Sequence, residues 1–211
     1  MSTRIYLLPL WLRLWHWTNA SLILVLIVTG VSLHFAEPNL LLVPFALAAR
    51  IHSTAGVCLA GLYATFVLAN AISGNWWQYI PKPPGILRRC WAQILYYAFG
   101  ILRGAPHPHE PSVEHNFNDL QSVIYFSVMY LLLPTVIGTG LLFLYPQAAP
   151  DRIGGLDGLL PIAVLHYVAG ATITLFLIGH VYLGTTGHTA TSLFKTMITG
   201  WHEGSETEPH P

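Results

Sequence analysis

The chain has 211 residues, of which 54% are hydrophobic and only 9% are charged. A soluble domain carries about 25% charged residues, so this composition indicates a membrane protein. Nine Lys and Arg residues balance nine Asp and Glu residues, and the lack of a basic excess argues against a nucleic-acid partner. The two cysteines form neither a CxxC nor a CxxCH motif, which argues against iron–sulfur ligation and covalently attached haem.

Four stretches are long and apolar enough to cross a bilayer, which takes about 20 residues. They are roughly residues 12–35, 46–72, 119–145 and 160–187. The first is rich in tryptophan and lacks a small-residue cleavage site, so we expect it to be retained rather than removed as a signal peptide. The predicted fold class is an all-α membrane protein, a bundle of four transmembrane helices. It forms a single domain over about 1–200, with a tail at 201–211.

The loop between the second and third spans, about 73–118, contains a further helical pattern. Its central part, ILRRCWAQILYYAFGILRG, combines basic and aromatic residues, which is typical of an amphipathic helix at the membrane interface. We interpret it as a covering segment rather than a binding element. The final segment, GSETEPHP, is predicted to be disordered.

Lysine and arginine in short loops predict the orientation, because positively charged segments stay in the cytoplasm. Seven basic residues lie in the N-terminal segment, the 73–118 loop and the segment after the fourth span: Arg4, Arg13, Lys82, Arg88, Arg89, Arg103 and Lys195. The opposite side has only Arg50 and Arg152. Both termini are therefore expected in the cytoplasm.

Four histidines lie within the predicted spans: His16 in the first, His52 in the second, and His166 and His180 in the fourth. Ionisable side chains at membrane depth are costly and usually face the bundle interior for a function. His166 and His180 are 14 residues apart, so they share a helix face about 21 Å apart. By depth, His16 pairs with His180 in the cytoplasmic half and His52 with His166 in the outer half. Because a histidine pair can ligate one haem iron, we predict two b-type haems between helices one, two and four.

A small residue follows each of these histidines by four positions. In chain order they are Ala20, Gly56, Gly170 and Gly184. This position is the next turn on the same helix face, where a porphyrin lying edge-on against the helix needs space. Small residues are common in transmembrane helices, but their recurrence at all four positions favours haem binding.

The remaining candidates have simpler alternatives. Any one intramembrane histidine could instead hydrogen-bond a neighbouring helix, and His34, at the outer end of the first span, is a weaker candidate for the outer haem. Arg13 and Arg50 precede proposed ligands by three and two residues. They could pair with haem propionates or simply set the topology. The histidines outside the spans or at their ends are expected to be solvated: His107, His109, His115, His188, His202 and His210.

Four segments resemble a known family: RLWHWTN, RIHSTAG, LHYVAG and GHVYLG. They are similar to the haem-binding segments of the cytochrome b subunits of membrane-bound nickel–iron hydrogenase, formate dehydrogenase and thiosulfate reductase, over most of the chain. The resemblance implies four core helices, haem ligands on the first, second and fourth, and the pairing already reached from depth. It also implies a place in the bacterial cytoplasmic (inner) membrane.

The resemblance extends to a quinone-binding segment at the start of the third helix, HNFNDLQS. Asn118 and Gln121 match the family's pattern, which implies a menaquinone or ubiquinone beside the inner haem. Phe117 replaces the usual tyrosine, and Asp119 stands where proline or a small residue is common. The alternative is a helix N-cap formed by Asn118 or Asp119.

The predicted function is that of a di-haem b-type cytochrome subunit that transfers electrons between an outer-face partner and membrane quinone. The implied partner is an iron–sulfur protein or a multihaem cytochrome c, and this chain has no substrate-oxidising site of its own. Reversed flow, with quinol oxidised to feed an outer reductase or a multihaem cytochrome, uses the same parts. A histidine-lined transporter and a purely structural anchor are the alternatives from other classes.

Overall fold

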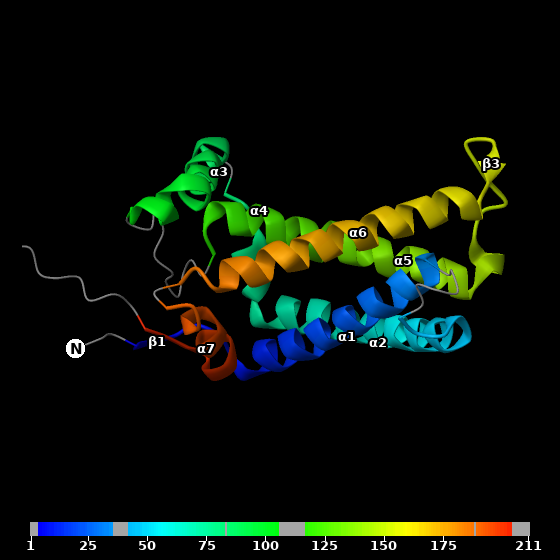
Figure 1. The fold of residues 1–211 in the computed structure, drawn as a ribbon, viewed down its shortest axis with the longest axis horizontal. Helices are drawn as coiled ribbons and strands as arrows, with labels where there is room; N and C mark the ends of the chain where they lie inside the picture. Colours follow the sequence, from blue (N-terminus) through cyan, green and yellow to red (C-terminus); the bar gives the residue numbers. More distant parts are fainter. Residues whose placement is uncertain (1–3, 36–41, 83, 106–116, 188, 204–211) are drawn as a thin grey trace, which may run out of the picture. The chain divides into compact units, whose positions relative to one another are not determined.

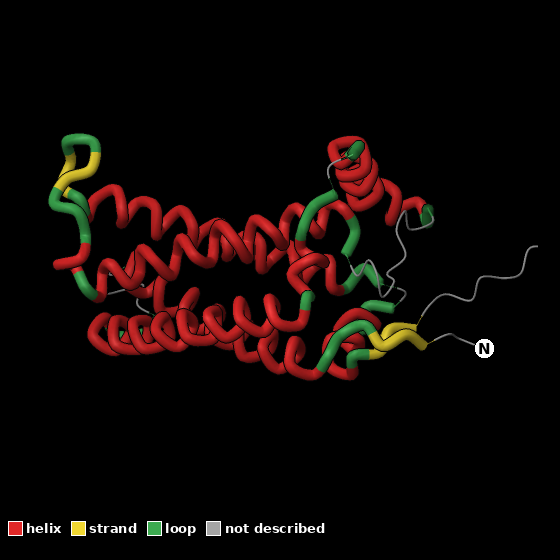
Figure 2. The backbone as a smooth tube through the Cα atoms, turned by 180° about the vertical axis from the view of Figure 1, so that it is seen from behind, coloured by secondary structure: helices red, strands yellow, loops and turns green. Residues whose placement is uncertain are grey.

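The structure is a computed structural model that describes residues 4–35, 42–82, 84–105, 117–187 and 189–203. The described chain is mostly helical (Figures 1 and 2). Four helical segments are long and apolar enough to cross a membrane: α1 (Leu10–His34), α2 (Phe45–Ser73), the segment Asp119–Leu144, and α6 (Leu159–Gly184). These bounds differ from the predicted spans by three residues at most, and they confirm the prediction of four candidate transmembrane helices.

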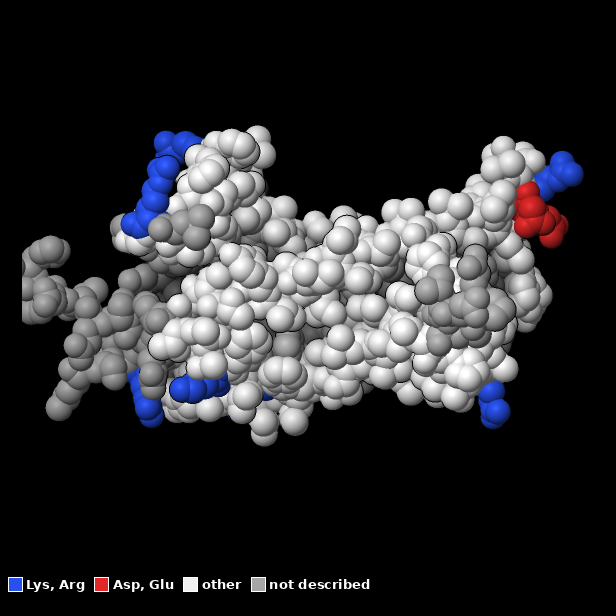
Figure 3. All heavy atoms as spheres, in the orientation of Figure 1, with Lys and Arg blue, Asp and Glu red and all other residues white. Residues whose placement is uncertain are grey.

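Charged residues within these four segments occur only near their N-terminal ends. Arg13 lies in the first turn of α1, Arg50 in the second turn of α2, and Asp119 at the start of the third segment. Figure 3 shows most Lys and Arg side chains of the visible face at the helix ends and in connecting segments. The long middle part of each segment is therefore suited to the hydrocarbon layer, where a charge is costly.

The chain divides into two compact units. One comprises residues 1–13, 71–127 and 177–211, and the other comprises residues 14–70 and 128–176. The second unit contains most of α1 and α2, the first part of α6, and the C-terminal part of the third segment. Its largest fully buried side chains are those of Phe66, Leu133, Asn70 and Ser32.

The third segment is built from three consecutive helical pieces. They are α4 (Asp119–Ser127), the π-helix η4 (Val128–Leu132) and α5 (Leu133–Leu144). Pro134 has no N–H group, so in the wider π register it cannot bond the carbonyl of Met129, five residues earlier. Tyr63 of α2 replaces that donor, because its Oη donates to the Met129 carbonyl over 2.8 Å. This hydrogen bond ties α2 to the third segment.

A short hairpin joins the third segment to α6. After the 3₁₀ turn η5 (Pro146–Ala148), strand β2 (Arg152–Ile153) pairs antiparallel with β3 (Leu156–Asp157). Gly154 and Gly155 form the two-residue loop with φ of 59° and 85°. Positive φ at both positions is what a type I′ hairpin turn requires.

In the first unit, the two ends of the described chain pair with each other. Strand β1 (Arg4–Tyr6) is antiparallel to β4 (Trp201–Glu203), so part of the predicted tail is a strand. Helix α7 (Ser192–Thr199) ends at Gly200, whose φ is 85° and whose carbonyl accepts from the Leu7 N–H over 2.9 Å. A Cβ there would lie 2.6 Å from the Leu8 carbonyl oxygen, so only glycine allows this approach. The predicted disordered segment 204–211 lies outside the described residues.

The predicted amphipathic helix is present in the same unit. The segment continues from the short helix η1 (Asn75–Tyr79) into α3 (Ile86–Leu95), the π-helix η2 (Tyr96–Gly100) and the 3₁₀ turn η3 (Ile101–Arg103). Leu87 and Trp91, one turn apart on α3, are both strongly exposed. This exposed apolar pair fits the prediction of a helix lying at the membrane interface.

Candidate functional site

The two histidines of the predicted outer pair lie close together within the second unit. His52 of α2 and His166 of α6 have ring centroids 6.3 Å apart, and their planes are inclined by 69°. Metal–imidazole bonds are about 2.0 Å long, so two rings that share one ion have centroids roughly 6 Å apart. The separation therefore suits one iron between them, and both rings are only half-buried.

Each of these histidines is held by a threonine of another helix, which sequence reasoning did not anticipate. Thr29 Oγ1 on α1 lies 2.9 Å from His52 Nδ1, and Thr139 Oγ1 on α5 lies 2.9 Å from His166 Nδ1. Both threonines are buried. Because Nδ1 is occupied in each ring, Nε2 is the nitrogen left for a metal ion. The sequence signal was a Thr-Gly dipeptide in both the first and third spans.

The glycine of each Thr-Gly dipeptide contacts the same histidine as its threonine. A Cβ added to Gly140 would lie 3.2 Å from His166 Cε1, and one added to Gly30 would lie 3.4 Å from His52 Cε1. The absence of a side chain thus lets each imidazole lie against the neighbouring helix. Both rings are supported in the same way, by one hydroxyl and one glycine.

Gly56 and Gly170, one turn after His52 and His166, have open space where a side chain would point. A Cβ added to either would meet no atom within 4 Å. This space is what the sequence predicted for a porphyrin lying edge-on beside each ligand. It is an observation of fit, and haem contact at these two glycines stays a prediction.

Replacing Gly56 or Gly170 with leucine is expected to displace the outer haem although no ligand is changed, because the added side chain would fill the space beside the imidazole. We expect haem content, measured by the pyridine haemochrome assay, to fall toward one per chain. Gly61→Leu is the matched control, since Gly61 lies on α2 and also has nothing within 4 Å of an added Cβ. Full haem content in both Gly56→Leu and Gly170→Leu would contradict the edge-on arrangement.

The two histidines of the predicted inner pair belong to different units, so their pairing stays a prediction. His16 lies on α1, where its ring contacts that of Trp17 with centroids 5.3 Å apart. His180 lies on α6, and its ring contacts that of Tyr125 on α4 with centroids 6.0 Å apart and planes inclined by 72°. His180 is thereby linked to the start of the third segment.

An aromatic series continues from Tyr125 away from His180. The Phe117 ring lies 4.9 Å from that of Tyr125 and 5.5 Å from that of Tyr79, centroid to centroid. Phe117 takes the place of the tyrosine expected from the resemblance, and its ring packs between those of Tyr79 and Tyr125. The residues suggested for a quinone pocket follow it directly in the chain.

Asn118 and Gln121 form a reciprocal cap at the start of α4. Asn118 Oδ1 accepts from the Gln121 backbone N–H over 2.8 Å, and Gln121 Oε1 accepts from the Asn118 backbone N–H over 3.1 Å. This is the geometry of a capping box, and it confirms the alternative interpretation of Asn118 as an N-cap. Asn118 Nδ2 also donates to Tyr97 Oη over 3.1 Å, and burial raises the pKa of Tyr97. The quinone role of both amides stays a prediction.

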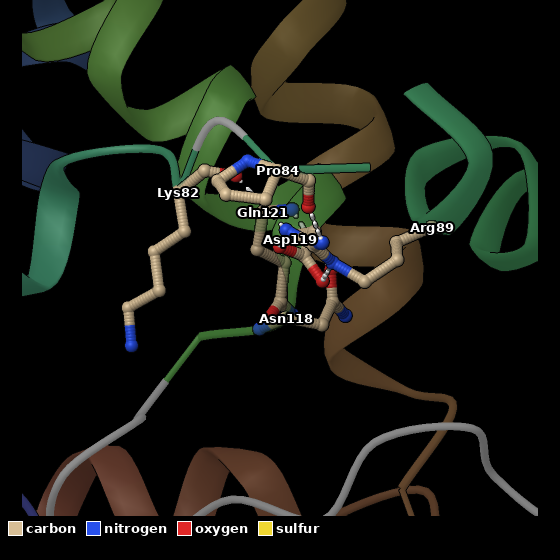
Figure 4. A network of polar contacts seen from close by, with 6 residues as sticks. All are labelled: Lys82, Pro84, Arg89, Asn118, Asp119 and Gln121. Atoms are coloured by element: carbon tan, nitrogen blue, oxygen red, sulfur yellow. Dashed lines mark hydrogen bonds and ion pairs between the residues drawn. The ribbon is translucent and has the colours of Figure 1, made fainter. Parts of the chain in front are cut away.

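Asp119, which departs from the family's pattern, is held by a bidentate ion pair (Figure 4). Arg89 of α3 donates from Nε and Nη2 to the two carboxylate oxygens of Asp119, each over 2.7 Å. The same guanidinium donates to the carbonyls of Lys82, over 2.9 Å, and Pro84. The carboxylate of Asp119 raises the pKa of Arg89. Arg89 therefore joins Lys82, Pro84 and α3 to the start of α4.

The structure also places four other predicted or weaker candidates. Arg13 Nη1 donates to the Ile198 carbonyl near the end of α7, whereas Arg50 is exposed. A Cβ added to Gly184 would lie 3.0 Å from the Phe194 ring, which offers a packing reason for that glycine. The ring of His34 stacks on that of Tyr167, with centroids 4.4 Å apart. Haem contacts of Arg13, Arg50 and Gly184 stay predictions.

Within the described ranges, no three His, Cys, Asp or Glu side chains come together as a protein-only metal centre would require. The paired histidines at 52 and 166 are instead a two-ligand arrangement. Two protein ligands suit an iron whose other four positions are filled by a porphyrin.

Comparison with known proteins agrees with this chemistry. A family model described as prokaryotic cytochrome b561 matches residues 7–200. A protein of Escherichia coli (strain K12) named "Putative cytochrome YdhU" is 39% identical over 199 residues, which cover 94% of this chain and 75% of that protein. No solved structure matches the chain significantly. By the match over most of its length, the chain belongs to the prokaryotic cytochrome b561 family.

Proposed function

We propose that this membrane-bound b-type cytochrome binds two haem b groups and transfers electrons between a partner subunit on the outer face and the membrane quinone pool. Membership of the family implies b-type haem and electron transfer. The number of haems, the quinone and the partner go beyond what the family implies. They are the finer part of this proposal.

The observation that carries the proposal is the outer histidine pair. His52 and His166 are 6.3 Å apart between centroids, with Nδ1 of each engaged by a threonine. When bound between two imidazoles, a haem supplies one-electron transfer without an open coordination position. The residues present fit such a group, because they offer two Nε2 atoms and open space beside Gly56 and Gly170.

The proposed inner pair is supported by the continuity of α6. This helix runs from Leu159 to Gly184 with no break, so His166 and His180 keep the spacing that places both on one face. His16 lies in the second turn of α1, on the same side of the membrane as His180 by the topology argument. We therefore assign His16 and His180 to the second haem.

The quinone is proposed to bind at the cytoplasmic start of the third segment. Tyr125, which contacts the His180 ring, lies one turn after Gln121 on α4. Asn118, Gln121 and Tyr97 supply amide and hydroxyl groups beside this contact. A quinone carbonyl needs such hydrogen-bond partners, and a site near the aqueous phase eases proton exchange. The quinone is menaquinone or ubiquinone in this proposal.

The proposed orientation places both termini in the cytoplasm of a bacterium and the β2–β3 side outside. The excess of Lys and Arg in the N-terminal segment, the 73–118 loop and the segment after α6 supports this orientation. An iron–sulfur protein or a multihaem cytochrome c would then dock on the outer face. Flow in either direction uses the same two haems.

The direct test is the haem content of the purified full chain. We expect a pyridine haemochrome assay to find two non-covalent b-type haems per polypeptide, and a visible spectrum of six-coordinate, low-spin iron, because both axial positions are filled by histidine. One haem per chain, or none, would contradict the proposal.

A further inference from the structure

The threonines that contact the outer histidine pair have the same set of hydrogen bonds. Thr29 Oγ1 donates to the Val25 carbonyl and Thr139 Oγ1 to the Thr135 carbonyl, each over 2.7 Å and four residues back in its own helix. Each hydroxyl oxygen also lies 2.9 Å from Nδ1 of its histidine. Two different helices, α1 and α5, thus present an identical group to the two rings.

These bonds identify which ring nitrogen carries the proton. A hydroxyl has one hydrogen, and the short bond to the helix carbonyl uses it, so the threonine oxygen accepts and Nδ1 donates. Each hydroxyl also has the carbonyl three residues back within reach, Leu26 for Thr29 and Val136 for Thr139, at 3.3 and 3.2 Å, so its hydrogen has acceptors in its own helix. In both rings the proton is therefore on Nδ1, and Nε2 keeps its lone pair.

We infer that Thr29 and Thr139 are positioning residues that hold His52 and His166 in the metal-binding tautomer and lower the reduction potential of the outer haem. The inference rests on the proposed function, in which these two histidines share one haem. An N–H that donates to an outer partner raises the basicity of the ligand nitrogen and fixes the ring plane. A more basic ligand favours ferric over ferrous iron, so the effect on the potential is downward.

Both proposed axial ligands have the same threonine contact at Nδ1. This repetition distinguishes the arrangement from a single incidental hydrogen bond. Four other threonines in these helices have a side-chain bond only to a carbonyl three or four residues back, as Thr172 does to Val168 over 2.8 Å. Thr29 and Thr139 add the histidine contact, and the following glycines let the rings approach. The two ring planes are thereby held at an inclination of 69°.

The test replaces each hydroxyl by a methyl group in the full chain. Valine keeps the β-branched shape of threonine but accepts no hydrogen bond. In Thr29→Val/Thr139→Val we expect the oxidised-to-reduced ratio of one haem, at a fixed potential, to shift about tenfold toward the reduced form. For a one-electron couple this is about 59 mV upward. Each single variant should shift the ratio about threefold, which is half of that change in potential. The low-spin ferric EPR signal of that haem should also change as the planes of its imidazole ligands become free to turn.

Thr172→Val is the matched control, because Thr172 is exposed and makes only the carbonyl bond; it should leave both potentials and the EPR spectrum unchanged. If the double valine variant lacks the outer haem, Thr29→Ser and Thr139→Ser decide, since serine restores the hydroxyl. Recovery of haem and potential by serine supports the inference. Failure of serine to restore them assigns the threonines to packing and overturns it.

An unshifted potential and unchanged EPR signal in the double valine variant, with two haems bound, would overturn this inference and leave the proposed function standing. A wild-type chain that binds no haem between His52 and His166 would instead overturn both. The visible redox titration of wild-type protein, run alongside the variants, separates these two results.

Discussion

Replacing His52 with alanine is expected to remove the same haem as replacing His166 with alanine, and each change should lower the haem content from two per chain to one. The two imidazole centroids are 6.3 Å apart. Because both rings are the proposed ligands of one iron, either change takes away half of one axial pair. A porphyrin iron held from one side loses its six-coordinate, low-spin state. The haemochrome assay and the low-spin EPR signals of the purified variants would measure this loss.

The inner pair offers the complementary half of the experiment. His16→Ala and His180→Ala should lose the other spectroscopic component and keep the one that His52 and His166 support. His34→Ala is the control for a neighbouring ring, because His34 stacks on Tyr167, the residue after His166; it should retain both haems. Loss of one common component in the His16 and His166 variants would show that the assignment by depth is wrong.

Removal of the amides at the start of α4 is expected to slow haem–quinone transfer at least tenfold, about 1.4 kcal/mol of barrier, with both haem spectra intact. The variant is Asn118→Ala combined with Gln121→Ala. Its physical basis is the loss of hydrogen-bond groups beside the Tyr125–His180 contact. Quinol oxidation or quinone reduction in membranes, followed through the haem absorbance, measures the rate.

The capping box calls for a second variant that separates binding from helix stability. Losing the cap costs about 1 kcal/mol, and the double alanine variant loses both of its hydrogen bonds. Asn118→Ser retains an N-cap acceptor but lacks the amide that donates to Tyr97. We expect this variant to be as stable as wild type and still slow with quinone. A normal rate in Asn118→Ser and a slow one in the double variant would assign the effect to the cap.

The capping box at Asn118 and the ion pair at Asp119 show how much of a local motif the sequence alone predicts. The sequence offered two interpretations of Asn118, and the structure confirmed the cap because both amides lie within bonding distance of each other's backbone N–H groups. Asp119 looked like an unexplained departure. Its partner, Arg89, is 30 residues earlier on another helix, and no local pattern identifies a partner at that separation.

The sequence by itself determined the four apolar segments, their bounds to within three residues, and that His16, His52, His166 and His180 lie within them. Hydropathy and the 3.6-residue helical repeat are properties of one segment at a time, so they can be predicted without knowing which helices are neighbours. Only the tertiary structure decided that Thr29 and Thr139 contact the outer histidines and that Gly30 and Gly140 make room for their rings. It also decided that Gly184 packs close to the Phe194 ring. Each of these contacts depends on how a helix is rotated against another, and that rotation is set by side-chain packing across the interface.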